Sequence, residues 1–173
     1  MTTYFSLRLF LIGITLIVPA LLLQAQEKPT EKVVEHHAAD HIMVVPTDII
    51  WKDGPASLPK GAKSAVVEGD PSKAGPFTMQ IQLPANYKIS PHWHPAIEHV
   101  TVLDGSFYMG TGEVFDESKA TKLPVGGFAV MAIGTRHFAF TKEKATVQLH
   151  GIGPWGINYV NPENDPRKKP SGQ

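Results

Sequence analysis

The sequence contains no cysteine among its 173 residues. Disulfide bonds, thiolate nucleophiles, cysteine-ligated zinc fingers and iron–sulfur ligation are therefore all excluded. The sequence also lacks an excess of charge of either sign, because 16 Lys and Arg balance 16 Asp and Glu, and its longest basic run is Arg167-Lys168-Lys169. Since nucleic-acid binding requires the neutralisation of many phosphates, nucleic acid is a poor candidate partner.

The residues that are abundant point to a folded, turn-rich chain. With 42% hydrophobic and 18% charged residues, the sequence has the size and apolar content of one globular domain with extensions. Its 15 glycines and 15 prolines predict many tight turns between short strands. Its eight histidines keep a nitrogen-ligated metal site open.

The first segment, residues 1–25, has the pattern of a secretory signal peptide. It carries one charge, Arg8, followed by an apolar run over residues 9–23 and by Ala25, a small residue suited to cleavage. The run is interrupted by a glycine and a proline and is shorter than the roughly 20 apolar residues of a spanning helix. We expect cleavage before Gln26 and a periplasmic or secreted protein, whose only membrane contact is this segment. An uncleaved N-terminal anchor is the alternative.

The rest of the chain divides into three parts. Residues 26–44 are polar and charged and predict a linker or N-terminal arm, and residues 161–173 predict a polar C-terminal tail. A β domain is expected between them, over residues 45–160. Three histidines in or near the arm are expected to have no specific role: His36, His37 and His41.

Short runs of alternating apolar and polar residues predict the β structure. Residues 77–83 and 147–150 alternate strictly, so each run would have one apolar and one polar face. Val100 and Val102 precede Asp104-Gly105, which predicts a strand entering a tight hairpin. No segment after residue 45 keeps a helical period for three turns. The fold class is therefore all-β, with strands that can close into a barrel and so remove exposed edges.

One cluster of residues has the spacing of a metal site. His92 and His94 are two apart, so on a strand their imidazoles project from one face. Glu98 would lie about 13 Å beyond His94 on a straight strand, too far for two ligands that each sit about 2.1 Å from one ion. The chain must therefore fold back, beginning near Pro95. Glu98 would then open the next strand, with His99 pointing away from the metal.

The spacing His-x-His-x3-Glu-x6-Gly, completed by Gly105, is moderately specific. Its chance occurrence in a chain of this composition is on the order of 10⁻³. The alternative interpretation is a pair of surface histidines on an edge strand, with Glu98 in a solvated turn.

Residues 91–105 resemble the first motif of the cupin superfamily at His92, His94, Glu98 and Gly105. Asn86 stands where that motif opens with Gly, and Asn also tolerates left-handed backbone.

The second cupin motif is matched at Gly126, Gly134 and His137. Ala132 stands in place of its Pro, and Thr141 stands in place of its Asn. The resemblance covers about residues 76–141.

This resemblance implies a single-domain cupin β-barrel (a double-stranded β-helix or jelly roll) whose metal is held by His92, His94, Glu98 and His137. It also implies homodimers formed through strand and edge contacts. Three neutral imidazoles and one carboxylate would leave a divalent ion with a charge of about +1 and with open coordination positions. Without a carboxylate-rich cage Ca is disfavoured, and Fe, Mn, Ni or Zn remain.

Other side chains carry weaker predictions. Gln148 and His150 share one face of a late strand, where they would either support the site or face solvent. Tyr108 and Arg136 are the candidates for an acid or an anion clamp near the site. Residues 110–127 are long for a hairpin loop and predict a short helical turn, as surface decoration rather than as a lid. Several large side chains are expected to pack in the core or line a pocket: Met79, Phe107, Met109, Met131, Phe138 and Trp155.

Three functions follow from these observations. The first is an exported metal-dependent oxidoreductase, dioxygenase-like, that acts on a small organic substrate with Glu98 as ligand and proton acceptor. The second is a non-catalytic module that binds metal or a small ligand as a sensor or store. The third, a metal-free structural barrel, fits the intact ligand spacing least well. Fold alone does not distinguish the first two.

Overall fold

The computed structural model describes residues 41–168. The predicted signal segment and nearly all of the predicted arm lie outside the described residues. The described chain consists mainly of short strands joined by turns. The strands are β1 (Lys52–Asp53), β2 (Lys63–Gly69), β3 (Gly75–Leu83), β4 (Lys88–Trp93), β5 (Glu98–Asp104), β6 (Phe107–Thr111), β7 (Thr121–Leu123), β8 (Phe128–Met131), β9 (His137–Phe140), β10 (Ala145–Gly153) and β11 (Asn158–Tyr159). The short 3₁₀ helices are η1 (Pro46–Asp48), η2 (Glu117–Lys119), η3 (Pro162–Asn164) and η4 (Pro166–Lys168).

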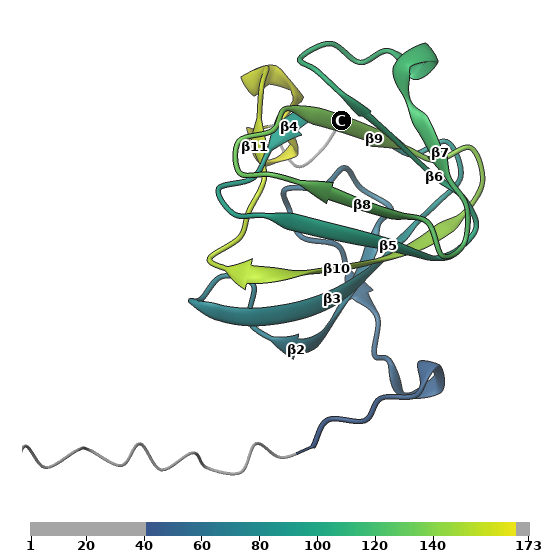
Figure 1. The fold of residues 1–173 in the computed structure, drawn as a ribbon, viewed down its shortest axis with the longest axis vertical. Helices are drawn as coiled ribbons and strands as arrows, with labels where there is room; N and C mark the ends of the chain where they lie inside the picture. Colours follow the sequence, from purple (N-terminus) through teal and green to yellow (C-terminus); the bar gives the residue numbers. More distant parts are fainter. Residues whose placement is uncertain (1–40, 169–173) are drawn as a thin grey trace, which may run out of the picture. The chain divides into compact units, whose positions relative to one another are not determined.

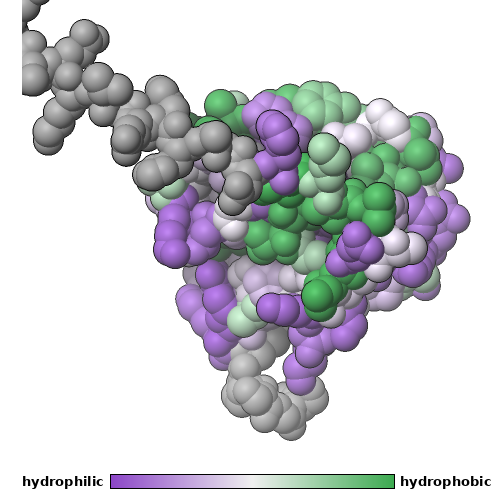
Figure 2. Space-filling view, turned by 90° about the horizontal axis from the view of Figure 1, so that it is seen from below, coloured by the Kyte–Doolittle hydropathy of each residue, from purple (hydrophilic) through white to green (hydrophobic). Residues whose placement is uncertain are grey.

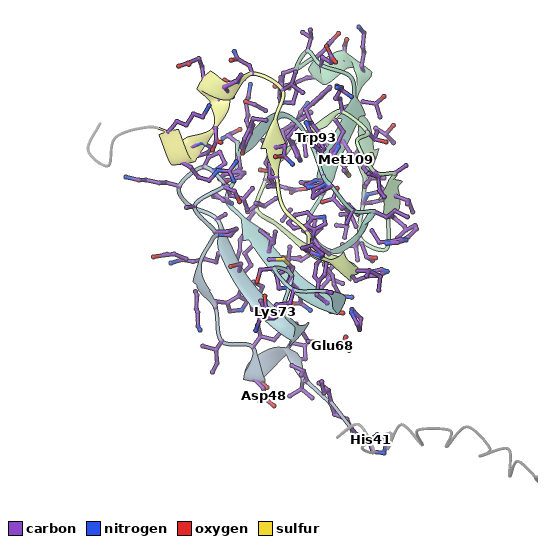
Figure 3. The ribbon with its side chains drawn as sticks, turned by 90° about the vertical axis from the view of Figure 1, so that its left-hand side faces the viewer. His41, Asp48, Glu68, Lys73, Trp93 and Met109 are labelled. Carbon is purple, nitrogen blue, oxygen red and sulfur yellow. The ribbon has the colours of Figure 1, made fainter. Side chains whose placement is uncertain are left out.

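The strands form two antiparallel sheets that face each other, as the all-β prediction requires (Figure 1). One sheet has the order β1-β2-β3-β10-β5-β8, and the other has the order β11-β4-β9-β6-β7. Consecutive strands β4 and β5 lie in different sheets, as do β8 and β9. In Figure 3, Met109 of β6 and Trp93 of β4 lie on one side of the barrel, and Glu68 and Lys73 of the β2–β3 region lie on the other.

The alternating sequence pattern builds the core between the sheets. Every second residue of β3 from Phe77 to Leu83 is buried, and on β10 Val147 and Leu149 are buried while Gln148 is only half-buried. β3 and β10 pair in register along their whole lengths, so their apolar faces form one surface. The core contains the predicted residues Met79, Phe107 and Met109, together with Phe77.

The predicted hairpin at Asp104-Gly105 is wrong. Gly105 has the left-handed φ of 70° that a tight turn requires, but the turn carries the chain from β5 in one sheet to β6 in the other. A Cβ on Gly105 would lie 2.2 Å from the carbonyl oxygen of Lys144. The glycine is needed for a close crossing between sheets, which has the same local sequence signature as a hairpin turn.

Residues 110–127 contain the predicted helical turn, η2, and also a strand, β7, which pairs with β6. Phe115 from this segment packs against Phe138, with ring centroids 4.9 Å apart, and Lys88 lies over the Phe115 ring and 3.2 Å from Glu117. Phe138 alternates with the cavity-facing residues of β9, so the segment covers the outer face of the five-stranded sheet. It is surface decoration, as predicted, rather than a lid.

The described part of the predicted tail is folded. Arg167 makes two short hydrogen bonds to the Asp165 carboxylate and donates a third, of 3.0 Å, to the carbonyl of Ile157. These contacts hold η3 and η4, which lie beyond residue 160, against the end of the β domain. The spacing of apolar residues in the sequence could not predict η3 and η4, because polar contacts of Arg167 hold them in place.

A hydrophobic area bordered by hydrophilic residues lies on the face seen from below the view of Figure 1 (Figure 2). Val66 of β2 and Ile50, which precedes β1, are exposed apolar side chains. Among residues 41–168, no helix has the length and apolar character that a membrane crossing requires.

Candidate metal centre

Three elements bring the predicted ligands together inside the barrel. His92 lies near the end of β4 and His94 just beyond it, and their side chains point to the same buried interior. β4 pairs antiparallel with β9 so that His92 lies opposite His137, the first residue of β9. The chain turns at Pro95 and returns in the other sheet, where Glu98 begins β5, as the spacing predicted. All four side chains are buried.

The ligand atoms converge on one point. One nitrogen from each of His92, His94 and His137 lies within 4.8 Å of the others. The Nε2 atoms of His94 and His137 are 3.4 Å and 3.2 Å from the two carboxylate oxygens of Glu98. Ligand atoms that each lie about 2.1 Å from one ion are about 3.0 to 3.4 Å apart in octahedral or tetrahedral geometry. The carboxylate and the imidazoles therefore have the spacing of a shared coordination shell.

Backbone carbonyls orient the three imidazoles. The Nδ1 atom of His92 donates to the carbonyl of Ser90 (2.8 Å), that of His94 to Gly156 (2.7 Å) and that of His137 to Thr135 (2.9 Å). When Nδ1 carries the proton, the Nε2 lone pair of the neutral ring is free to bind a metal. Nε2 of His94 and Oε2 of Glu98 are buried without a geometrically acceptable hydrogen bond. Such orphaned polar atoms are costly unless something else satisfies them, and a cation would do so.

Burial and mutual charge set the protonation of the cluster. Burial, together with the neighbouring His137 and His94, lowers the pKa of His92 to about 3, so this ring is neutral at pH 7. Burial alone would raise the pKa of Glu98, but its contacts with His137 and His94 outweigh burial and lower it below its ordinary value. A neutral imidazole and an ionised carboxylate are the forms that bind a divalent transition metal.

The cavity around these groups is small and otherwise apolar. Its volume is about 30 Å³, and apart from the four candidate ligands it is lined by aliphatic and aromatic side chains. Leu58, Ile81, Phe107 and Leu149 are among them. An apolar, low-dielectric surrounding strengthens the electrostatic interactions of the site.

Trp155 is a site residue that spacing arguments assigned only to packing. Its indole lies nearly parallel to the His94 imidazole, with ring centroids 4.4 Å apart, and it also packs against Phe77. The backbone of the next residue, Gly156, accepts the hydrogen bond from His94. The Gly-Pro-Trp-Gly sequence marks a turn with one large aromatic, but only the fold shows that it meets residue 94, about 60 residues earlier in the chain.

The structure separates the remaining predicted residues from this centre. His99 points away, as predicted, and its ring stacks on that of His150 on the outer side of the six-stranded sheet, with centroids 4.7 Å apart. Gln148 is on the same outer side, where its amide oxygen accepts from Gln80. Neither Gln148 nor His150 supports the metal cavity, so the solvent-side alternative is the correct one.

Tyr108 and Arg136, the predicted acid and anion clamp, are not site residues. Tyr108 alternates with the cavity residues of β6 and stacks on Phe140 outside the cavity. Arg136 precedes the candidate ligand His137 but turns outward, where it forms an exposed ion pair of 2.8 Å with Glu113. Both predictions were wrong, because a residue that is close in sequence to a cavity residue can project from the opposite face of the sheet.

The positions that depart from the cupin motifs keep the geometry that those motifs require. Asn86 has a left-handed φ of 57°, as expected where Gly is replaced by Asn. Thr141, in place of Asn, is buried and donates a hydrogen bond of 2.6 Å to the carbonyl of Pro84 while accepting one of 3.1 Å from the amide of Tyr87. It therefore ties the end of β9 to the turn before β4. Gly126 and Gly134 also have positive φ.

The likeness to known proteins is one of structure. No protein-family model matches the sequence, and no curated protein matches it. Among solved structures, the polyketide cyclase RemF from Streptomyces resistomycificus is 18% identical, with a TM-score of 0.58 over 72% of this chain and 89% of that chain. An acetylacetone dioxygenase-like protein from Methylibium petroleiphilum PM1 is 19% identical, with a TM-score of 0.54 over 72% and 84%.

A cupin 2 conserved barrel domain protein from Rhodopseudomonas palustris is 11% identical to this chain. Its TM-score is 0.53 over 70% of this chain and 86% of that chain. At these sequence identities, the comparisons show a similar fold and nothing about function. This fold is the one that the two sequence motifs led us to expect.

Proposed function

We propose, from the cupin fold that this chain has and from its buried ligand set, that the protein is a metal-dependent oxidoreductase, dioxygenase-like, acting on a small organic substrate. The observation that carries this proposal is the convergence of three oriented imidazoles and the Glu98 carboxylate in one apolar cavity. A structural barrel has no need for four buried polar side chains, two of which, His94 and Glu98, have an orphaned atom that costs free energy without a ligand.

The residues that would hold the ion are His92, His94, Glu98 and His137. Their nitrogen and oxygen donors suit one divalent transition metal, Fe, Mn, Ni or Zn. When bound, such an ion would polarise a substrate oxygen or, if redox-active, support chemistry with dioxygen. The two structural neighbours described as a cyclase and as dioxygenase-like support a small organic substrate.

The chain itself contributes orientation, water exclusion and one proton acceptor. The carbonyls of Ser90, Thr135 and Gly156 hold the imidazoles in a single tautomer, so no reorganisation is needed at the site. Glu98 is the catalytic residue of this proposal: its lowered pKa keeps it ionised as a metal ligand, and its carboxylate oxygens are the candidate acceptor for a substrate proton. The apolar cavity wall excludes competing water.

The test combines metal analysis with oxygen uptake. Protein purified without an affinity tag is refolded with Fe(II), Mn(II), Ni(II) or Zn(II), and one bound ion per chain is expected. Oxygen uptake is then measured against a panel of phenols, enols and carboxylates for the wild type and for His94→Ala. His41→Ala, which changes an exposed histidine, is the matched control. The absence of bound metal in every preparation would contradict the proposal.

A second candidate function is a non-catalytic module that binds metal or a small ligand. The small volume of the cavity favours it, since about 30 Å³ is close to the volume of one water molecule in the liquid. Stoichiometric metal binding without oxygen uptake by any redox-active form would select this function.

Export is part of the proposal and rests on residues 1–25, which lie outside the described residues. We expect the mature protein to begin at Gln26, in the periplasm or the medium, and intact-mass measurement of exported protein tests this. A mass that includes Met1 would contradict it. A homodimer is also expected, and sedimentation of the mature chain distinguishes it from a monomer.

A further inference from the structure

We propose that the organic body of the substrate binds in a second, larger pocket outside the metal cavity, and that Trp155 is the specificity-determining wall between the two. This inference rests on the proposed function, because it gives the metal site its substrate class. It concerns side chains of this chain that the cupin motifs do not include.

The metal cavity cannot hold an organic substrate as it stands. Its volume of about 30 Å³ accommodates roughly one water molecule, and an ion bound to the four ligands would occupy part of that space. A reacting oxygen could reach the ion, but the rest of a substrate would need to lie elsewhere. The neighbouring space therefore determines which molecules can react.

A pocket of about 970 Å³ adjoins this cavity. It is formed by the turn between β4 and β5, the turn after β8, and the end of β10 with the segment that follows it. Ile97, Ile133 and Ile152 are lining residues that are exposed to solvent although they are large and apolar. Its volume is that of pockets that bury small organic molecules, and its lining is predominantly apolar, as such pockets are.

Trp155 and Ile157 line both the metal cavity and this outer pocket. They are therefore the partition between the two spaces. Trp155 lies against His94, so displacement of its indole would expose a ligand face of the metal site to the outer pocket. The backbone on either side is held, because the amide of Trp155 donates to Pro71 and the carbonyl of Gly156 accepts from His94. The side chain is thus the part that can move.

The indole Nε1 of Trp155 provides an independent sign of a ligand. It is buried and has no hydrogen-bond partner among the described residues. An unsatisfied buried donor costs free energy, which a hydrogen bond to a substrate oxygen could recover. A molecule with an apolar body and a hydrogen-bond acceptor close to its metal-binding end would meet this need.

The charges of the outer pocket favour an uncharged substrate. Arg167 contributes to its lining, but this guanidinium is already paired with Asp165. Glu68 adds a negative charge on another side, where its carboxylate accepts from Thr78. His99 and His150 also line this pocket, and among its Asp, Glu, Lys and Arg side chains an anion would meet Glu68 and an Arg167 that is already neutralised by Asp165. The substrate class is therefore a neutral, mainly apolar molecule that carries an enol, ketone or phenol oxygen.

The first experiment tests the pocket without metal. Metal-free protein is titrated with the uncharged fluorophore N-phenyl-1-naphthylamine, and saturable binding is expected. Ile152→Asp and Ile133→Asp should each raise the Kd at least fivefold. Val114→Asp, which changes an exposed aliphatic residue outside the pocket, should leave the Kd within twofold of the wild type. No saturable binding, or equal effects of all three variants, would overturn the pocket.

The second experiment tests Trp155 through the kinetics of metal exchange. In Zn(II)-loaded protein, Trp155→Ala should speed both metal loading and metal removal by EDTA at least tenfold while leaving the Zn(II) Kd within threefold. Trp155→Phe should lie between the wild type and Trp155→Ala. A residue that merely positions His94 would weaken the Kd without faster loading, and that result, or unchanged rates, would overturn the assignment.

The two arms separate the failure of this inference from the failure of the proposed function. If no metal binds, the proposed function fails, while the fluorophore titration still decides whether the pocket takes an apolar molecule. If metal binds but neither arm behaves as expected, the metal site stands and the assignment of the pocket and of Trp155 falls.

Discussion

The Glu98 carboxylate lies between two imidazoles, with one oxygen 3.4 Å from Nε2 of His94 and the other 3.2 Å from Nε2 of His137. Glu98 comes from the six-stranded sheet, His137 comes from the other sheet, and His94 lies just beyond its β4 strand. The ligand set therefore joins the two layers of the barrel, and its properties can be tested one residue at a time.

Glu98→Gln keeps the size of the side chain but removes its charge. Because a neutral amide compensates a divalent cation much less than a carboxylate does, metal affinity should fall at least about tenfold. Isothermal titration calorimetry with Zn(II) or Mn(II) measures this. Glu143→Gln, an exposed change of the same kind, should bind metal like the wild type. Equal affinity of the two variants would remove Glu98 from the ligand set.

The metal-free protein should lose stability in mild acid. Burial lowers the folded-state pKa of His92 to about 3, whereas an unfolded histidine has a pKa near 6.5. Between these values the unfolded chain binds the additional proton, so stability decreases as pH falls, by up to about 1.4 kcal/mol per pH unit for one such group.

Urea unfolding at pH 7.5 and 5.0 measures this loss, and His92→Asn should show a smaller decrease. Glu98 contributes little in this window, because its stabilisation is lost only as pH falls below the ordinary glutamate pKa of 4.5. A stability that is equal at the two pH values would show that His92 is not buried as a neutral ring.

Thr141→Val should destabilise the fold without changing the shape of the side chain. The substitution removes the hydroxyl that donates to Pro84 and leaves the amide of Tyr87 without its acceptor. The expected loss is about 1–3 kcal/mol in the free energy of unfolding. Thr121→Val, at an exposed strand position, is the control and should change stability little. Identical denaturation midpoints would contradict the role given to Thr141.

Gly105→Ala should be destabilising for two reasons that add. The backbone there has a left-handed φ of 70°, and a Cβ would lie 2.2 Å from the carbonyl oxygen of Lys144. Left-handed strain and overpacking together predict a loss of at least about 2 kcal/mol. Gly156→Ala, where a Cβ would meet open space, should be tolerated in the same denaturation assay.

Local sequence patterns predicted the strands and the ligands, because both depend on short spacings. Alternation over residues 77–83 predicts one apolar face of β3. In the same way, His92 and His94 are two residues apart and project from the same face of an extended segment, which does not depend on their tertiary surroundings. The need for ligands to meet at one ion then required the chain to turn at Pro95. The left-handed backbone at Asn86 was likewise readable from residue type.

Some predictions required knowing on which face of a sheet a side chain lies, or which distant residue it contacts. These predictions were wrong or remained open. Tyr108 and Arg136 lie beside cavity residues in sequence but point outward, and the turn at Gly105 crosses between sheets instead of forming a hairpin. A turn residue specifies the local backbone, but not which strand will pair with the one that follows.

By itself, the sequence determined that the chain is an all-β domain without thiol chemistry and with three candidate metal ligands of fixed spacing, His92, His94 and Glu98, since these properties follow from composition and short periodicities. The fourth candidate, His137, was expected only from the resemblance to the second cupin motif. Only the tertiary structure decided that His94 lies against Trp155, that three backbone carbonyls orient the imidazoles, and that a larger apolar pocket adjoins the small cavity around the candidate ligands. These contacts join residues far apart in the chain, and the way the two sheets pack sets them.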